Sequence, residues 1–235
     1  MIQERKGISM DRLLNRINQA ARAADRILEM VDCAEYDITD PSSIINYANY
    51  SNMPDYMQFS YGASRLAIWD TEYCDYVIKV ALDEQYEKYC QHEVEVYEAA
   101  VKEGLADNFA WCMCYAQPQY DDEGEYETPG IYVMEYVDCD EDVNMDEVWK
   151  YGYSQYCKER GLDSSSYDYA DEYDEWNCEE DDGLVLEYVE SQMNDEQRRL
   201  FNVFMMKWWI TDIHNCNIGH IGNRIVILDY AGWNW

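Results

Sequence analysis

The sequence has few positive charges and no long apolar run. Lysine and arginine number 17 against 49 aspartates and glutamates in 235 residues, which gives a net charge of −32. A chain this acidic repels nucleic-acid phosphates and anionic membranes, so we expect no direct nucleic-acid binding and no membrane partner. No stretch of 18 apolar residues occurs, which argues against a transmembrane helix. The first residues lack the apolar core of a signal peptide.

Histidines and closely paired cysteines are also scarce. There are three histidines, and the nine cysteines include no C-x-x-C pair, the closest two being Cys112 and Cys114. This spacing matches no zinc ligand set. An odd number of scattered cysteines favours reduced thiols, and we therefore expect a cytoplasmic protein.

Acidic residues concentrate in the second half of the chain and alternate with aromatic ones. Residues 121–182 hold 23 Asp and Glu against three Lys and Arg. With 48% hydrophobic and 15% aromatic residues, the chain is folded rather than disordered. Such acidity is explained by solubility, by a salt-adapted host, or by mimicry of a nucleic-acid backbone. It favours a host protein with a basic surface as partner, and the expected contact loops are 121–127, 138–147 and 163–182.

Hydrophobic periodicity predicts an α+β fold. Apolar residues recur every three or four positions over residues 9–31, which is typical of an amphipathic helix. Asn194, with Gln197 at the capping-box position, predicts the start of a helix whose apolar face begins at Leu200. Strands are predicted over 57–61, 66–69, 75–81, 109–116 and 131–137, further helices over 83–103, 141–161 and 184–193, a hairpin-length acidic insertion over 117–130, and loops over 40–56 and 162–183.

This order of elements predicts three segments. The first is an N-terminal helical segment, residues 1–40. The second is a sheet-bearing lobe, residues 57–140, and the third is a mainly helical lobe, residues 141–235.

The last part of the chain carries an Asp–Asn–Asp pattern suited to phosphoryl transfer. Asp212 is followed five positions later by Asn217, and the apolar run 225–228 ends at Asp229. One carboxylate can accept a hydroxyl proton, while the amide and the second carboxylate can hold Mg²⁺ against nucleotide phosphates. Taken singly, Asp212 and Asn217 are also ordinary turn residues.

A lysine inside an apolar strand supplies the matching cation. Lys79 lies between Ile78 and Val80, and it either extends past the edge of the sheet or faces an anion, because burying an unpaired charge is costly. The expected carboxylate partner is Glu93, which falls on the inner stripe of the following helix. Glu95 falls on the outer face.

These motifs resemble the protein-kinase-like family, most closely the short early protein kinases of podoviruses. The run Val77-Ile78-Lys79-Val80 resembles the strand whose lysine pairs with the nucleotide phosphates. The run from Asp212 to Asn217 resembles a catalytic loop of the D-x-H-x-x-N form, and Asp229 stands at the metal-binding position. The resemblance implies a two-lobed kinase-like fold, with an antiparallel N-lobe sheet and a truncated helical C-lobe.

The resemblance also implies ATP and Mg²⁺ as cofactors. His214, at a position where protein kinases usually have lysine, would contact the γ-phosphate or hydrogen-bond the loop. Gly62 would let the backbone approach the phosphates. The implied site residues are, for catalysis, Asp212, Lys79, Glu93 and His214; for the cofactor, Gly62, Ser64 and Lys79; and for the metal, Asn217 and Asp229.

The sequence therefore predicts a phage-type kinase-like protein that phosphorylates Ser or Thr of host proteins, in the cytoplasm of an infected bacterium. The alternative is a catalytically weak or inactive kinase-like scaffold whose acidic loops mimic nucleic acid and inhibit a host restriction, CRISPR-type or transcription enzyme. The glycine-rich loop reduced to Gly62 favours this alternative. A small-molecule kinase is a third possibility, because the D-x-H-x-x-N loop also occurs in antibiotic and choline kinases.

Overall fold

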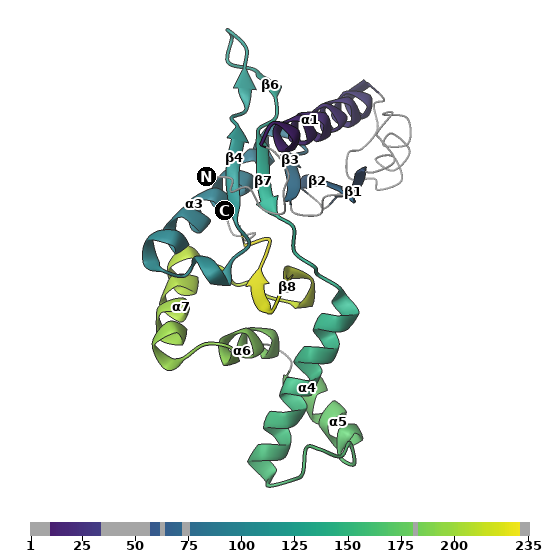
Figure 1. The fold of residues 1–235 in the computed structure, drawn as a ribbon, viewed down its shortest axis with the longest axis vertical. Coiled ribbons are helices and arrows are strands. Elements are labelled where there is room, and N and C mark those ends of the chain that lie inside the picture. Colours follow the sequence, from purple (N-terminus) through teal and green to yellow (C-terminus); the bar gives the residue numbers. More distant parts are fainter. Residues whose placement is uncertain (1–9, 34–56, 62–63, 72–75, 181–182, 231–235) are drawn as a thin grey trace. The chain divides into compact units, whose positions relative to one another are not determined.

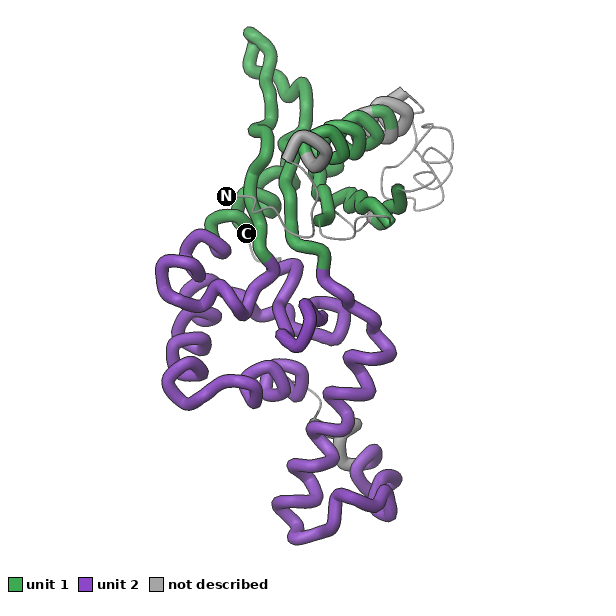
Figure 2. The backbone as a smooth tube through the Cα atoms, viewed as in Figure 1, with its two compact units in different colours: residues 1–95, 111–136 green, residues 96–110, 137–235 purple. Residues whose placement is uncertain are grey.

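The computed structural model describes residues 10–33, 57–61, 64–71, 76–180 and 183–230. The chain divides into two compact units, which Figure 2 shows in separate colours. Unit 1 comprises residues 1–95 and 111–136, and unit 2 comprises residues 96–110 and 137–235. The combination of antiparallel strands and helices confirms the α+β class (Figure 1). The predicted three-segment division stays a prediction.

Unit 1 is built on a five-stranded antiparallel sheet of order β1-β2-β3-β7-β4. Its strands are β1 (Met57–Tyr61), β2 (Arg65–Asp70), β3 (Tyr76–Ala81), β4 (Cys112–Ala116) and β7 (Ile131–Glu135). All five were predicted from β-forming residues. The fourth begins three residues later than expected, because Phe109 and Ala110 pair with the second unit's β9 (Arg224–Ile227) instead.

The two faces of this sheet carry different side chains. On one face Leu66, Ile68, Ile78 and Val80 pack against the helix α1 (Met10–Cys33), which Figure 1 shows lying across the strands. Side chains alternate along a strand, so the residues between these apolar ones point to the opposite face.

That opposite face packs against the helix α3 (Glu84–Glu103). Cys90 of the helix forms a buried cluster there with Ala81 and Tyr132 of the sheet. Lys79, opposite Tyr132 in the strand register, therefore points toward the α3 side of the sheet. The predicted helices 9–31 and 83–103 are both confirmed, within two residues at each end.

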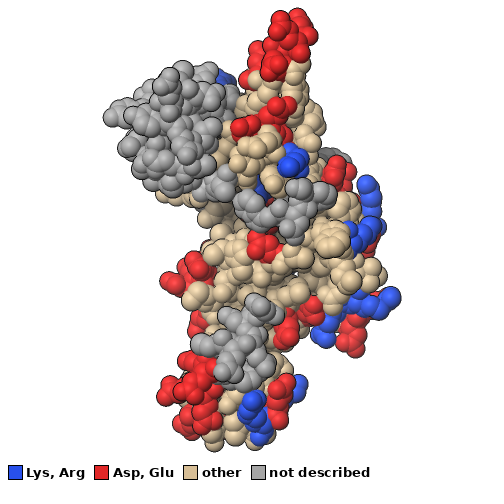
Figure 3. All heavy atoms as spheres, turned by 180° about the vertical axis from the view of Figure 1, so that it is seen from behind, with Lys and Arg blue, Asp and Glu red and all other residues tan. Residues whose placement is uncertain are grey.

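The acidic insertion of unit 1 forms a small hairpin of β5 (Gln119–Tyr120) and β6 (Tyr126–Thr128). At its turn the carboxylate of Asp121 accepts hydrogen bonds from the backbone N–H groups of Glu123 and Glu125. The Asp and Glu residues of 121–127 are all exposed, and Figure 3 shows them as a red group at the hairpin tip.

A buried carboxylate on α3 holds the base of this hairpin. Glu87, 3% exposed, accepts hydrogen bonds from the hydroxyls of Tyr126 and Tyr132 and from the backbone N–H of Gly130. Burial raises the pKa of both tyrosine hydroxyls, and their contact with Glu87 raises it further. A side chain at Gly130 would collide with Tyr132 and Glu87. The acidic hairpin is therefore anchored at its base by a buried carboxylate whose oxygens accept hydrogen bonds.

Unit 2 holds helices and one short antiparallel pair. Its core centres on Phe109, whose ring packs against Phe201, Phe204 and Tyr230. Besides the end of α3 from residue 96 on, its elements are η1 (Ala106–Asn108), α4 (Glu141–Arg160), α5 (Ala170–Glu180), α6 (Leu184–Ser191), α7 (Asp195–Trp208), η2 (Asn215–Asn217), β8 (Ile218–Ile221) and β9.

The prediction of a loop over residues 162–183 is wrong in its second half, where α5 forms. Tyr173 of α5 is completely buried and packs edge-on against Trp149, Tyr153 and Tyr156 of α4. The indole N–H of Trp149 also donates to Asp174 at 2.7 Å. Aromatic packing thus outweighs the repulsion among acidic residues of this helix, of which Asp171, Glu172, Asp174 and Glu175 are exposed.

The helix predicted after Asn194 forms with its capping box. The Asn194 side chain accepts hydrogen bonds from the N–H groups of Glu196 and Gln197, and Gln197 reaches back to the Asn194 N–H. Leu200, expected on the apolar face, is instead 40% exposed. Among the residues that the model describes, no helix could cross a membrane.

Candidate functional site

In unit 1, Lys79 and Glu93 form a buried ion pair. The Lys79 Nζ lies 3.0 Å and 3.2 Å from the two carboxylate oxygens of Glu93. Glu93 has no exposed side-chain surface, and Lys79 keeps 11%. The contact expected between β3 and α3 is therefore present, while the phosphate-binding role of Lys79 stays a prediction.

A second cation reaches the same carboxylate. Arg65 of β2 lies 2.7 Å from Glu93 through its Nη1, and its side chain is 11% exposed. Burial lowers the pKa of Lys79, and the charge of Arg65 adds to that effect while Glu93 opposes it. Burial alone would raise the pKa of Glu93, but Arg65 and then Lys79 hold it below its ordinary value. The two cations therefore favour the carboxylate form of Glu93.

Sequence reasoning missed Arg65. The available signal was an arginine directly after the small residues of the reduced glycine-rich loop. The structure describes only one of the two residues of this loop that the sequence assigned to the cofactor. Gly62 lies outside the described residues, while Ser64 is buried and its backbone carbonyl accepts a hydrogen bond from Leu82. The cofactor-binding role of both stays a prediction.

In unit 2, Asn217 organises the segment that carries Asp212 and Asp229. The Asn217 side-chain nitrogen donates to the Asp212 carbonyl at 2.9 Å, and the Asn217 carbonyl accepts from the Leu228 N–H at 2.9 Å. Two backbone sites that are 16 residues apart are thus tied through a single residue. Because the amide nitrogen is engaged, the Asn217 Oδ1 is directed away from the Asp212 carbonyl and can face a cation.

The side chain of Asp212 is accessible, as a general base needs to be. It is 42% exposed, and the Nε2 of His214 lies 3.7 Å from its Oδ1. The Nδ1 of His214 accepts a hydrogen bond from the Cys216 N–H. The structure therefore shows His214 in the loop-bonding role, one of the two predicted for it, with its other nitrogen toward Asp212.

Asp229 follows the end of β9 in an unusual backbone conformation. Its φ of +56° lies in the left-handed region that side chains other than glycine seldom adopt. The next residue, Tyr230, is buried and donates its hydroxyl hydrogen to the Ala110 carbonyl at 2.9 Å. The strand and Tyr230 thus hold Asp229 from both sides in a conformation that costs free energy.

The donor set of this segment fits Mg²⁺. Asn217 and Asp229 offer the amide and carboxylate oxygens that this cation prefers. Over the described residues, no group of three or more His, Cys, Asp or Glu side chains could hold a metal ion by itself. A cation here would therefore take its remaining ligands from water and substrate phosphates, which is the usual arrangement for Mg²⁺.

A further residue that sequence reasoning missed is Asn144 of α4. It is 1% exposed, and its side-chain nitrogen donates to the carbonyls of Asn215 and Ile218, both at 2.9 Å. Those carbonyls flank Asn217, so Asn144 fixes the loop from outside. It falls within segment 138–147, which the sequence suggested as an acidic contact loop. A buried asparagine there has no distinguishing signal in a single sequence.

Glycine is required where β8 meets residues 137 and 138, which precede α4. A Cβ at Gly219 would lie 2.5 Å from the Asp138 carbonyl oxygen. The adjacent His220 exchanges both backbone hydrogen bonds with Asp138, and its ring reaches Glu147 at 3.0 Å. The segment after Asn217 is therefore fixed against residues near α4.

Comparisons with known proteins add little to this geometry. No protein-family model matches the chain, and no curated protein matches it significantly. Among solved structures, a chain described as the streptomycin–ATP–APH(2″)-IIa ternary complex is similar at 14% sequence identity and a TM-score of 0.35. The similarity covers 83% of this chain and 72% of that one.

Proposed function

We propose that the chain is a kinase-like phosphotransferase that uses ATP and Mg²⁺ to phosphorylate Ser or Thr of a host protein. The observation that carries this proposal is the pair of hydrogen bonds by which Asn217 connects the Asp212 carbonyl and the Leu228 N–H. One side chain holds the backbone of a half-exposed Asp212, and its own carbonyl holds the strand leading to Asp229. A base and two oxygen donors for a cation are thus kept in one segment, as phosphoryl transfer requires.

The residues would divide the reaction between them. Lys79, oriented by Glu93, would bind the nucleotide phosphates, and Asp212 would orient the acceptor hydroxyl and take its proton. Mg²⁺, held by Asn217 and Asp229, would neutralise charge on the phosphates. Because the chain has a net charge of −32, local cations are needed before an anionic nucleotide can approach.

The test is transfer of label from γ-labelled ATP, with Mg²⁺, to the chain itself, to a basic test protein and to a bacterial lysate. Asp212→Asn should lower the rate by about 10²–10⁴-fold, because it removes a positioned base. Asp122→Asn removes one carboxylate from the exposed hairpin turn and serves as the matched control. Phosphoamino-acid analysis of the product identifies the acceptor. Equal labelling by the wild type and Asp212→Asn would refute the proposal.

A double variant tests whether the two sets of residues serve one reaction. Residues that act as a unit are strongly non-additive. The combination of Lys79→Gln with Asp212→Asn should therefore lose little more activity than the worse single variant. Fully multiplicative losses would contradict a shared step.

A second candidate function is inhibition of a nucleic-acid-binding host enzyme by an acidic surface. The exposed carboxylates of 121–127 on an anchored hairpin favour it. Binding should weaken steeply with added salt, and reversing the charge of Asp122 and Glu123 together should reduce it. An inhibitory effect that persists in high salt and in this variant would exclude mimicry.

A further inference from the structure

Two cations of unit 1, Lys79 and Arg65, share the carboxylate of Glu93. Lys79 already contacts both oxygens of Glu93, at 3.0 Å and 3.2 Å. Arg65 then approaches one of the same oxygens at 2.7 Å. A guanidinium stays charged at any pH the protein meets. The chain therefore keeps a permanent cation beside the lysine.

The strand register explains how both cations reach one carboxylate. Ala67 pairs with Lys79, and Arg65 pairs with Ala81, across β2 and β3. Cross-strand partners lie on the same face, and so do alternate residues of one strand. Arg65 and Lys79 therefore point from neighbouring strands toward the α3 side of the sheet.

This arrangement is costly for stability alone. Burial lowers the pKa of Lys79, and the charge of Arg65 lowers it further, so a second cation next to Lys79 disfavours the charged lysine. Replacing buried charges by apolar side chains of similar volume is often neutral or stabilising. An apolar residue at position 65 would satisfy the fold without repulsion between the cations.

Within this cluster of three side chains, the exposed surface belongs to the two cations. Glu93 is fully buried, whereas Lys79 and Arg65 each keep 11% of their side chains exposed. A solute that reaches this point meets an ammonium and a guanidinium, with the carboxylate behind them. Arginine binds phosphate oxygens through two parallel hydrogen bonds, which lysine cannot do.

We propose that Arg65 is a second phosphate-binding residue, which with Lys79 holds the polyphosphate chain of a nucleotide. This inference rests on the proposed phosphotransferase function and deepens it. Glycine-rich loops bind phosphates through backbone N–H groups that glycine leaves accessible. Here residues 60–66 contain one glycine, and the Arg65 side chain supplies donors that such a loop would otherwise provide.

The test is calorimetric binding of the full chain to Mg²⁺–ATP, inorganic tripolyphosphate and adenosine at one fixed salt concentration. Arg65→Gln should lower the affinity for ATP and tripolyphosphate by roughly 10- to 100-fold, as expected for the loss of charged hydrogen bonds. Adenosine binding should stay within about twofold. Arg65→Lys keeps the charge but loses the planar guanidinium with its paired donors. Its affinity for ATP and tripolyphosphate should therefore lie between those of the wild type and Arg65→Gln.

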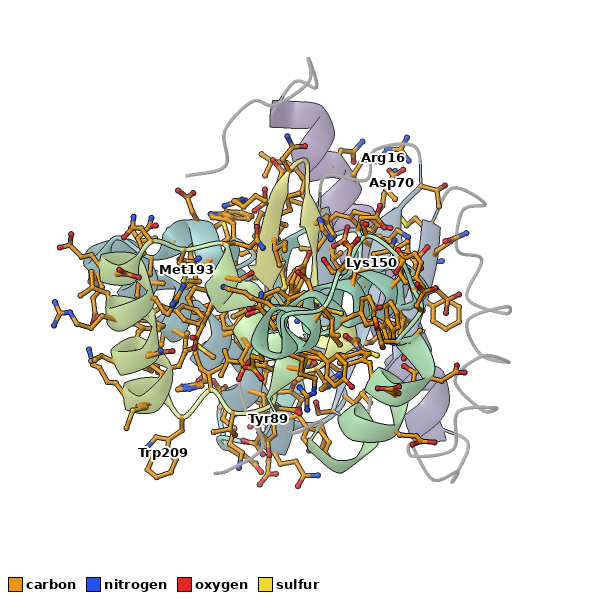
Figure 4. All side chains as sticks on the ribbon, turned by 90° about the horizontal axis from the view of Figure 1, so that it is seen from below. Arg16, Asp70, Tyr89, Lys150, Met193 and Trp209 are labelled. Atoms are coloured by element: carbon orange, nitrogen blue, oxygen red, sulfur yellow. The ribbon has the colours of Figure 1, made fainter. Side chains whose placement is uncertain are left out.

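Arg16→Gln is the matched control. Arg16 is also a partly buried arginine that pairs with a β2 carboxylate, Asp70 at 3.1 Å, and Figure 4 shows the two side by side. Asp70 lies on the opposite face from Arg65, because an odd number of positions separates them. Phosphate affinity of Arg16→Gln should remain within about twofold of the wild type.

Several outcomes would overturn the inference. One is unchanged tripolyphosphate affinity in both Arg65→Gln and Arg65→Lys while Lys79→Gln weakens it. Another is a wild type that binds neither ATP nor tripolyphosphate. If Arg65→Gln does not fold, Arg65→Lys alone decides. Arg65-dependent binding without label transfer would remove the proposed function and leave the inference standing. Label transfer that depends on Asp212, together with a phosphate affinity that does not depend on Arg65, would refute the inference and leave the proposed function standing.

Discussion

The two sets of candidate site residues are held in opposite ways. In unit 1, buried charged side chains hold one another, with Glu93 between Lys79 and Arg65. In unit 2, neutral amides of Asn144 and Asn217 hold the backbone of a loop whose Asp212 is half-exposed. The first arrangement depends on charge and the second on donor geometry. Substitutions that alter one property while keeping shape should therefore affect the two sites differently.

The largest expected effect is that of Glu93→Gln. It removes the buried carboxylate between two cations, which should lower the free energy of unfolding by about 3–5 kcal/mol. Urea unfolding measures the loss. Glu95→Gln, on the exposed side of the same helix, should change it by less than about 0.5 kcal/mol. Equal stability of Glu93→Gln and the wild type would mean that the charged cluster contributes nothing to folding.

The Glu93 cluster also predicts a pH dependence. Arg65 and Lys79 outweigh burial and hold the pKa of Glu93 below its ordinary value of 4.5. The folded state therefore binds this proton more weakly than the unfolded chain does, and the stabilisation is present above pH 4.5. As the pH falls through the lowered pKa, the difference in stability between the wild type and Glu93→Gln should narrow. A difference that widens in acid would contradict the direction of this shift.

Next in size is Asn144→Ala. It leaves the carbonyls of Asn215 and Ile218 without their buried donor, which should cost about 2–3 kcal/mol. Unlike the Glu93 effect, this loss should be nearly independent of pH, because no charge is involved. Ser154→Ala, exposed on the same helix, is the control. A loss that varied with pH as strongly as that of Glu93→Gln would remove the contrast between the sites.

Asn217→Asp should separate the two properties of a single side chain. The change keeps an oxygen that can face a cation but replaces the donor to the Asp212 carbonyl with a second acceptor. We expect a stability loss of about 1–2 kcal/mol together with a fall in transfer rate of at least tenfold. The ratio of rates at low and high Mg²⁺ tests whether cation binding survives. A full rate at saturating Mg²⁺ would show that the hydrogen bond is dispensable.

The smallest expected effect is that of Asn194→Ala at the start of α7. Loss of the capping box should cost about 1 kcal/mol and leave nucleotide affinity unchanged. Thermal unfolding and calorimetric binding check the two parts. A change in nucleotide affinity would mean that α7 acts on the site as well as on the fold.

The elements and site residues that could be predicted from the sequence are those whose signal lies within a short stretch of the chain. α1, the sheet strands and α3 carry clear apolar periodicity, and the Glu93 assignment follows from helix geometry alone. The helix α5 could not be predicted, because its acidic composition resembles a loop and only distant aromatic partners such as Trp149 stabilise it. Asn144 acts through tertiary contacts with no sequence signal to identify it, and Arg65 had only its place directly after the small residues of the reduced glycine-rich loop. The sequence pattern thus predicted most helices and strands and the Lys79–Glu93 ion pair. It did not predict the residues that support the site from other helices and strands.

The covering of the sheet by α1 has a consequence for the order of events during synthesis. The helix packs on a cluster that includes Val133 of β7, and β7 lies between β3 and β4 although it follows both in the chain. During synthesis α1 therefore has no complete surface to pack against until residue 135 has emerged. Such long-range closure slows folding and leaves an apolar face open in the meantime.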